Sequence, residues 1–276
     1  MEENIMVVQH NLRAMNSNRM LGLTQTTQSR STEKLSSGYK INRAADDAAG
    51  LAISEKMRRQ VRGLTQASAN AQDGISMVQT AEGALNEVHD MLQRMNELAV
   101  KAANGTMTAE DQSYIEKEVT ALKDEIDRVA TTTTFNEQSL LADNCTFKLQ
   151  VGAESNDDNQ IAVEIKKMDA SSLGITDASC GDVGEAKALI DQVKTAITNL
   201  NDQRADLGAQ QNRLEHTINN LDNVVENTTA AESAIRDTDM ASEMVKYSNN
   251  NILAQAGQAM LAQANQSNQG VLSLLG

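Results

Sequence analysis

Apolar residues recur every three or four positions along two long stretches of the chain. Each stretch covers 46 residues, from 57 to 102 and from 190 to 235, and would extend roughly 69 Å as a helix at 1.5 Å per residue. The first apolar seam is Met57, Val61, Leu64, Ala67, Ala71, Ile75, Val78, Ala81, Leu85, Val88, Leu92, Met95, Ala99 and Ala102. The second is Ile190, Val193, Ile197, Leu200, Arg204, Leu207, Gln211, Leu214, Ile218, Leu221, Val225, Thr228, Ala231 and Ile235. Their equal length predicts two helices that lie side by side.

A shorter seam lies between them, formed by Ile115, Val119, Leu122, Ile126 and Val129. The sequence Asn-Gly-Thr at residues 104–106 predicts a helix end before it, and Thr108 followed by Asp111 predicts a helix N-cap. We therefore expect the short helix to fold back on the first long one, which gives a three-helix rod.

Between residues 131 and 184 the apolar period changes from helical to alternating. Residues 145–151 and 161–165 alternate apolar and polar side chains, and residues 152–160 between them are polar and turn-like. This pattern predicts a β-hairpin, which we expect to cap one end of the rod.

The two chain ends, residues 6–36 and 241–275, have helical composition but thin apolar stripes among many Gln and Asn side chains. So little apolar surface cannot offset the entropy of ordering, so we expect both ends to be disordered alone and to order when copies pack together. The stripe residues are the candidate polymerisation contacts: Val8, Leu12 and Met15 at one end, and Ile252, Ala256, Met260, Val271 and Leu274 at the other.

Composition supports a helical protein and narrows its chemistry. The 276 residues include no proline and no tryptophan, and the net charge of −14 disfavours nucleic acid or an anionic membrane as a partner. No apolar run reaches the ~20 residues that span a bilayer, and the start lacks a secretory signal pattern, so we expect a cytoplasmic protein or one exported by another route. His10, His89 and His216 are isolated and no nucleotide or nucleophile motif occurs, so we expect no metal, cofactor or enzyme activity.

Cys145 and Cys180 flank the predicted hairpin and could pair in an oxidising medium. Strand alternation places Cys145 on the same face as Phe147 and Leu149, which favours a free, buried thiol at Cys145.

Several stretches resemble the bacterial flagellins. Residues 35–54 read LSSGYKINRAADDAAGLAIS, residues 93–100 read QRMNELAV, residues 234–241 read AIRDTDMA, and residues 255–265 read QAGQAMLAQAN. The resemblance covers nearly the whole chain except about residues 137–184, and the family pattern begins at Met6, five residues after the start.

The resemblance implies a mainly α fold: a long antiparallel helical coiled-coil rod, a small β-hairpin region, and terminal helices that form an inner coiled coil in a filament. Residues 1–50 would be the N-terminal part of the inner filament-core domain with its connector, residues 51–239 the rod with the hairpin at about 137–184, and residues 240–276 the C-terminal part of the core. Outer domains are missing, so a slender filament of two inner shells is expected.

The resemblance also implies a function and partners. The chain would be a structural subunit that polymerises with itself into a helical tube outside the cell for swimming. Its implied partners are an export chaperone that holds the C-terminal helix, the filament cap, the hook-associated proteins and the vertebrate innate flagellin receptor. Export would run through the flagellar type III channel.

Two groups of residues match functional positions of the family. Gln93, Arg94, Leu98 and Glu118 match receptor contacts, where Leu98 would be a small hot spot; the alternative is that they are ordinary filament contacts or solvated helix surface. Arg43, Asp46 and Asp47 would form an interdomain joint, or only an N-cap with a local ion pair.

Two other classes fit part of the pattern. A hook-filament junction protein has similar ends but departs from the rod motifs, and a signalling coiled coil explains the seams but not the ends. The missing prolines suggest a kinetic role beside the structural one, because a subunit that refolds at a growing tip would avoid slow prolyl isomerisation.

Overall fold

The computed structural model describes the backbone of residues 11–275 and the side chains of residues 11–267. The chain forms two compact units, one made of the residues up to 59 with those from 228 onward, and the other made of residues 60–227. Two long helices, α2 (Ala48–Ala102) and α4 (Val183–Arg236), contribute to both units. The predicted functional boundaries at residues 50 and 239 stay a prediction.

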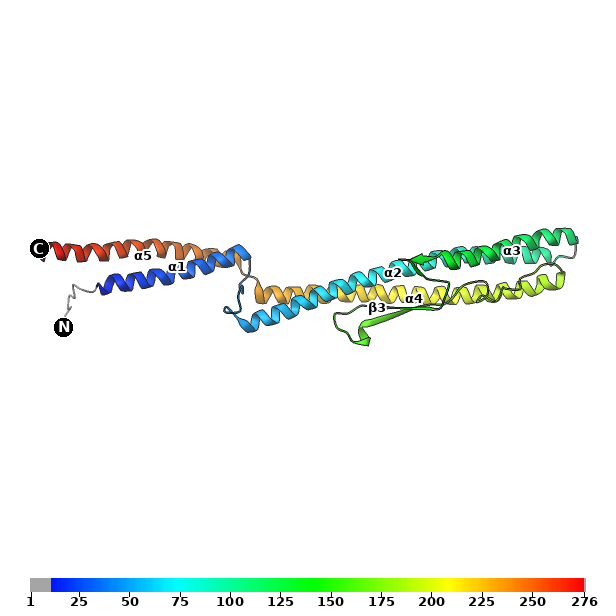
Figure 1. Ribbon diagram of the computed structural model, residues 1–276, viewed down its shortest axis with the longest axis horizontal. Coiled ribbons are helices and arrows are strands. Elements are labelled where there is room, and N and C mark those ends of the chain that lie inside the picture. Colours follow the sequence, from blue (N-terminus) through cyan, green and yellow to red (C-terminus); the bar gives the residue numbers. More distant parts are fainter. Residues whose placement is uncertain (1–10, 276) are drawn as a thin grey trace. The chain divides into compact units, whose positions relative to one another are not determined.

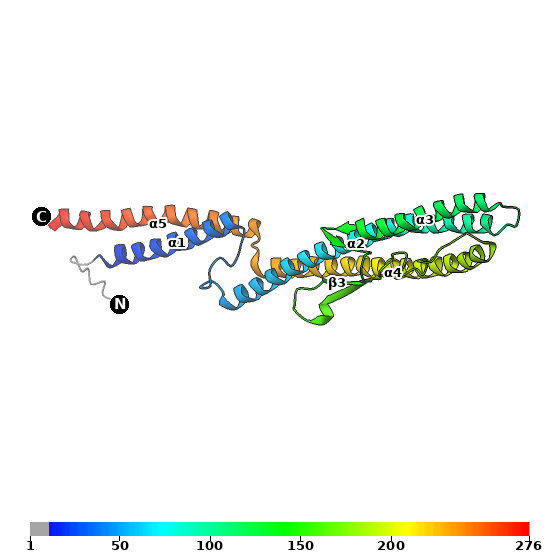
Figure 2. The ribbon, with the colours of Figure 1, turned by 45° about the vertical axis from the view of Figure 1, so that its right-hand side comes forward.

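Within residues 60–227, α2 and α4 pack with α3 (Ala109–Thr132) around the larger of two apolar clusters, as the seams predict (Figures 1 and 2). Leu85, Leu92 and Met95 of α2 and Ile126 of α3 are fully buried. Ion pairs and hydrogen bonds across α2 and α4, such as Ser68 Oγ to Asp222 Oδ1 at 3.3 Å, run in antiparallel register.

Near the N-terminal end of α4, every second residue of the buried stripe lies one position before the predicted one, while Val193, Leu200 and Leu207 are buried as predicted. Leu189, Ala196 and Gln203 are buried, whereas the predicted Ile190, Ile197 and Arg204 are half-buried. Adjacent apolar positions on α4 all touch the core, because its inner face is wide enough to include both rows.

The turn from α2 to α3 follows the predicted capping chemistry. Asp111 N donates to Thr108 Oγ1 at 3.2 Å, and Thr108 N donates to Asp111 Oδ2 at 3.1 Å. This reciprocal capping box satisfies N–H groups that the first turn of α3 leaves without intrahelical partners.

The predicted hairpin is present as β3 (Cys145–Gln150) and β4 (Gln160–Ile165), antiparallel with Phe147 opposite Val163. The prediction that the hairpin caps one end of the rod was wrong. The hairpin lies along the sides of the long helices, where Asn70 Nδ2 of α2 donates to Gln150 O at 3.0 Å and Gln203 Nε2 of α4 donates to Glu164 O at 3.2 Å. Gly74 leaves room for the Leu149 side chain to reach α2.

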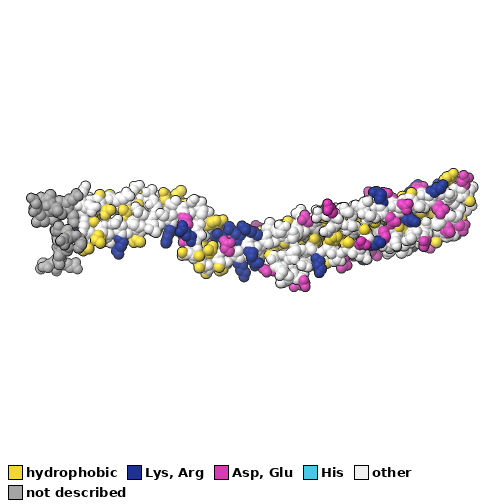
Figure 3. Space-filling model, viewed as in Figure 1, with side chains coloured by type: hydrophobic (Ala, Val, Ile, Leu, Met, Phe, Trp, Pro, Cys, Tyr) yellow, Lys and Arg dark blue, Asp and Glu magenta, His cyan; other side chains and the backbone are white. Residues whose placement is uncertain are grey.

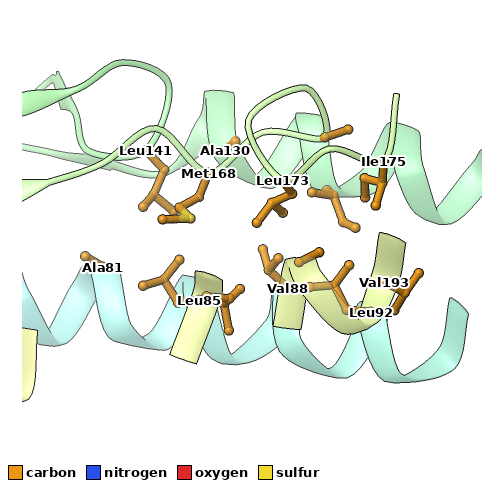
Figure 4. Packing of buried hydrophobic residues seen from close by; sticks show 14 of the residues in the cluster. Ala81, Leu85, Val88, Leu92, Ala130, Leu141, Met168, Leu173, Ile175 and Val193 are labelled. Carbon is orange, nitrogen blue, oxygen red and sulfur yellow. The ribbon is translucent and has the colours of Figure 1, made fainter. Parts of the chain in front are cut away.

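Two parts of this unit lie outside the predicted pattern. A two-residue turn at Asn136 and Glu137 joins the short strands β1 (Thr134–Phe135) and β2 (Gln138–Ser139). The irregular segment 166–182 carries a second set of core side chains, and Figure 4 shows Met168, Leu173 and Ile175 pointing at α2 across the core.

In the other unit, α1 (Leu12–Ser37) packs antiparallel to α5 (Met240–Leu275), which confirms the helical ends. Gly38 ends α1 in the left-handed conformation, at φ 77°, which a residue without Cβ adopts at little cost. Their disorder in the isolated chain stays a prediction. The five residues before Met6 and the stripe residue Val8 lie outside the described residues, as do the side chains of Val271 and Leu274.

Both cysteines are free thiols. The fully buried one is Cys180 rather than Cys145, which is half-buried, so the expectation of a buried Cys145 was wrong. Cys145 stands at the first position of β3, whereas Cys180 belongs to the irregular segment and is one of the side chains that it buries in the core. Among the described helices, none has an apolar stretch long enough to cross a bilayer.

Candidate functional site

The predicted polymerisation residues lie on the outside of the α1–α5 pair. Leu12 and Met15 of α1 and Ile252 and Met260 of α5 are 62–66% exposed, and Ala256 is exposed as well. Leu274 lies outside the residues whose side chains are described. The predicted residues whose side chains are described are therefore exposed to solvent. The exposed apolar surface is larger than the predicted stripe.

Ten of the thirteen large apolar side chains that are exposed in the described part of the chain belong to these two helices. They are Leu12, Met15, Met20, Leu23, Met240, Met244, Val245, Ile252, Leu253 and Met260. Figure 3 shows apolar side chains across the visible surface of this unit. Exposed apolar surface of this extent is typical of an interaction site. We call these ten side chains the apolar surface of α1 and α5.

The contact between α1 and α5 is thin. Among the side chains that the structure describes, Leu21 of α1 and Ala254 of α5 are the apolar ones buried there, and Gly257 lets Leu21 approach closely. At one end of the pair, Asn11 Nδ2 donates to Ala264 O at 3.0 Å while Asn11 Oδ1 caps α1 by accepting from Ala14 N at 2.9 Å.

A buried polar pair adds to this thin contact. Ser31 of α1 and Glu243 of α5 are about 5% exposed or less, and the Ser31 hydroxyl donates to the Glu243 carboxylate. This hydrogen bond, with the Lys246 ammonium 3.2 Å from Oε2, lowers the pKa of Glu243. Sequence reasoning missed this pair because Ser and Glu are ordinary surface residues in a polar helix.

The predicted joint residues lie in the connection between α1 and α2. Asp47 caps α2, its Oδ1 accepting from Gly50 N at 2.9 Å, and Arg43 Nε lies 2.9 Å from Glu33 Oε1. The backbone N–H groups of Arg43 and Asn42 donate to Asp46 and lower its pKa. These contacts are local, and a role as an interdomain joint stays a prediction.

Tyr39 has longer-range contacts in the same connection. The guanidinium groups of Arg236 and Arg58 lie 4.7 Å and 5.9 Å from the centre of its ring, and Arg58 Nη2 donates to the Tyr39 hydroxyl at 3.1 Å. Arg58 also pairs with Glu232 at 3.5 Å, and Arg236 pairs with Glu55. Thus one tyrosine ties the α1–α2 connection to the start of α2 and the end of α4. Tyr39 lies inside the LSSGYK motif. Because tyrosine is rare in this chain, its presence in that motif could have marked it as a structural contact.

The four predicted receptor residues occupy the side of α2 and α3. Arg94 donates to Glu118 Oε1 through Nε at 3.0 Å and Nη2 at 2.9 Å, and pairs with Glu97 at 3.0 Å. Gln93 is exposed and bonds His89, 2.7 Å away. Leu98 is only 4% exposed, so the expectation that it forms a surface hot spot was wrong for this subunit. It lies at the inner wall of an open groove of about 520 Å³ beside Arg94.

Within the described part of the chain, no group of three His, Cys, Asp or Glu side chains converges to hold a metal ion.

Comparisons with known proteins agree with the geometry. The family model of the bacterial flagellin N-terminal helical region matches residues 8–146, and that of the C-terminal helical region matches residues 190–275. A flagellin of Halalkalibacterium halodurans is 53% identical over 98% of this chain and 100% of its own length. The flagellar filament 31.3 kDa core protein of Treponema maltophilum is 47% identical over the same shares. The crystal structure of Bacillus cereus flagellin is 36% identical, with a TM-score of 0.49, and covers 55% of this chain and 88% of that one.

Proposed function

Because the chain belongs to the bacterial flagellins, which are structural filament subunits and not enzymes, we propose that α1 and α5 supply the contacts that polymerise it. The observation that carries this proposal is the apolar surface of α1 and α5, which no other part of the described subunit covers. Full-length similarity to named flagellins favours this role over a hook-filament junction protein or a signalling coiled coil.

Polymerisation needs two different surfaces that meet without closing a ring, so that each added subunit extends an open helix. The paired helices present apolar side chains on more than one face, with exposed Gln and Asn between them. Burying these side chains against neighbouring copies releases water from apolar surface, which is the main driving force of association.

Charge placed on this surface should stop growth. We expect the double variant Ile252→Asp with Met260→Asp to add to preformed filament seeds at less than a tenth of the normal rate, because each carboxylate must be desolvated at the contact. Gln258→Glu, an exposed neighbour on α5, is the control and should elongate seeds normally. Normal growth of the double variant, with its helix content intact by circular dichroism, would contradict the proposal.

The filament should be slender and lie outside the cell. Residues 147–189, between the two matched family regions, contain hairpin strands and the irregular segment rather than a further domain. A reconstruction by electron cryo-microscopy should show two inner shells, and an additional folded outer shell would refute this.

Export and capping partners follow from the same surface. The apolar side chains that α5 exposes before assembly suit a chaperone that holds the C-terminal helix until export through the type III channel. The cap and the hook-associated proteins would meet the same faces at the filament ends.

A vertebrate innate receptor is a second candidate partner, favoured by the exposed cluster of Gln93, Arg94 and Glu118. Leu98 is unsuitable for the test because its truncation would disturb the core. Gln93→Ala with Arg94→Ala should lower signalling in a receptor reporter assay, whereas Arg128→Ala on the exposed side of α3 should not. Unchanged signalling by the double variant would remove this candidate.

A further inference from the structure

The described methionines differ in exposure between the two units, with half-buried Met57 the exception in the first unit. In the described part, every strongly exposed methionine belongs to α1 or α5: Met15, Met20, Met240, Met244 and Met260, which are 48–63% exposed. In residues 60–227, by contrast, Met77, Met95 and Met168 are at most 4% exposed, and Met91 and Met107 are half-buried. The exposed thioethers make up half of the apolar surface of α1 and α5.

We propose that these five methionines are an oxidation site in the free subunit, and that their conversion to sulfoxides by a hydroperoxide blocks polymerisation. The block rests on the proposed function, whereas the pattern of oxidation rests only on exposure. Accessible thioethers are oxidised in preference to buried ones, and the product is polar.

The reaction is a two-electron oxygen transfer. A lone pair of the methionine sulfur attacks one peroxide oxygen, the O–O bond breaks, and the S–O bond forms. The leaving hydroxide takes the remaining peroxide proton and departs as water. Sulfur loses two electrons and hydrogen peroxide gains them, so no further reactant is needed.

The consequence for assembly follows from burial. A side chain that must be covered by apolar surface of a neighbouring copy can become a sulfoxide only at the cost of burying a strong hydrogen-bond acceptor without a partner. Five such positions on one subunit act together, so we expect oxidation to slow elongation at least about tenfold. This factor corresponds to a rise of about 1.4 kcal/mol in the activation free energy of elongation.

The first experiment maps oxidation in the full-length subunit. Folded free subunits are exposed to hydrogen peroxide, and peptides are analysed by mass spectrometry. Met15, Met20, Met240, Met244 and Met260 should oxidise several times faster than Met77, Met95 and Met168. Equal rates in both groups would overturn the oxidation site, whatever the filament does.

The second experiment measures elongation of preformed seeds by treated subunits. A variant with all five exposed methionines changed to Leu keeps apolar volume but cannot form sulfoxides, and should elongate equally before and after peroxide. A control variant with the half-buried Met57, Met91 and Met107 changed to Leu should remain peroxide-sensitive. Both variants retain Cys145 and Cys180, so thiol oxidation affects them alike.

The outcomes separate the two proposals. Normal elongation by fully oxidised wild-type subunits, or peroxide sensitivity of the five-Leu variant, would overturn the block. Untreated subunits that fail to elongate seeds would instead overturn the proposed function and the block with it, while the oxidation map still decides the site. Reduction by methionine sulfoxide reductases for both epimers should restore growth, and failure to restore it would show damage of another kind and count against the block.

Discussion

One aromatic side chain links the α1–α2 connection to the start of α2 and the end of α4. The guanidinium groups of Arg236 and Arg58 lie 4.7 Å and 5.9 Å from the centre of the Tyr39 ring, and a cation over an aromatic ring contributes about 0.5–1 kcal/mol at a partly exposed site. Tyr39→Ala should therefore lower the free energy of unfolding by about 1–2 kcal/mol and speed amide hydrogen exchange at residues 38–42. Tyr39→Phe is the matched control, because it loses only the hydroxyl that accepts from Arg58. Equal losses in both variants would mean that the hydroxyl, and not the ring, is the stabilising group.

Glu137 shows backbone strain at a single residue. Asn136 and Glu137 form the two-residue turn between β1 and β2 with φ of 49° and 64°, the left-handed pair of a type I′ turn. Asn tolerates this conformation, but for most residues with a Cβ it costs roughly 1–2 kcal/mol. Glu137→Gly should raise the free energy of unfolding by about 0.5–1 kcal/mol in urea denaturation. Glu137→Ala removes the same carboxylate and keeps the Cβ, so a similar gain from it would disprove the role of strain.

At the scale of elements, periodicity is the property that sequence reasoning used successfully. The helices and the β3–β4 hairpin were predictable because each repeats one burial pattern over many residues. Segment 166–182 contributes Met168, Leu173 and Ile175 to the core, yet its apolar residues have no regular spacing from which their burial could be predicted. The position of the hairpin could not be predicted from the sequence pattern either, because it depends on contacts such as Gln203 with Glu164 that join distant parts of the sequence.

The candidate site was likewise predictable from the sequence only in part. Exposed stripe residues such as Leu12 and Ile252 were predictable from their polar surroundings. Leu98 was misjudged because a family motif does not say which side of the helix faces α3. Ser31 and Glu243 could not be paired, since they are 212 positions apart and each is a common surface residue.

The contact between α1 and α5 should depend on pH through Glu243. Its pKa is lower in the folded state, so the charged form stabilises the pair above the unfolded pKa, and that stability is lost as pH falls through the folded value. We expect hydrogen exchange in α1 and α5 to accelerate as pH drops below about 4.3, after correction for intrinsic rates. Glu243→Gln keeps the shape but cannot titrate, and its exchange should depend less on pH. An identical pH profile in both proteins would assign the effect to other carboxylates.

At the scale of the whole molecule, the absence of proline from 276 residues has two explanations that make different predictions. Long helices exclude proline from their interiors, because it lacks the N–H that each turn requires. That reason does not apply to the loop between β3 and β4. Asn156 is exposed there with φ −78° and ψ 147°, backbone angles that proline adopts readily. A loop that accepts proline and lacks it favours a kinetic explanation as well.

Asn156→Pro tests this directly. The fold should be unchanged, but about 10–30% of unfolded chains would carry the cis isomer, and these should refold over tens of seconds at 25 °C. If refolding at the tip limits growth, seeds supplied with freshly unfolded Asn156→Pro subunits should elongate more slowly, and a prolyl isomerase should restore the rate. Asn156→Ala controls for loss of the side chain. An elongation rate equal to that of the wild type, despite a measured slow refolding phase, would leave helix geometry as the sufficient cause, because the isomer would then be invisible to assembly.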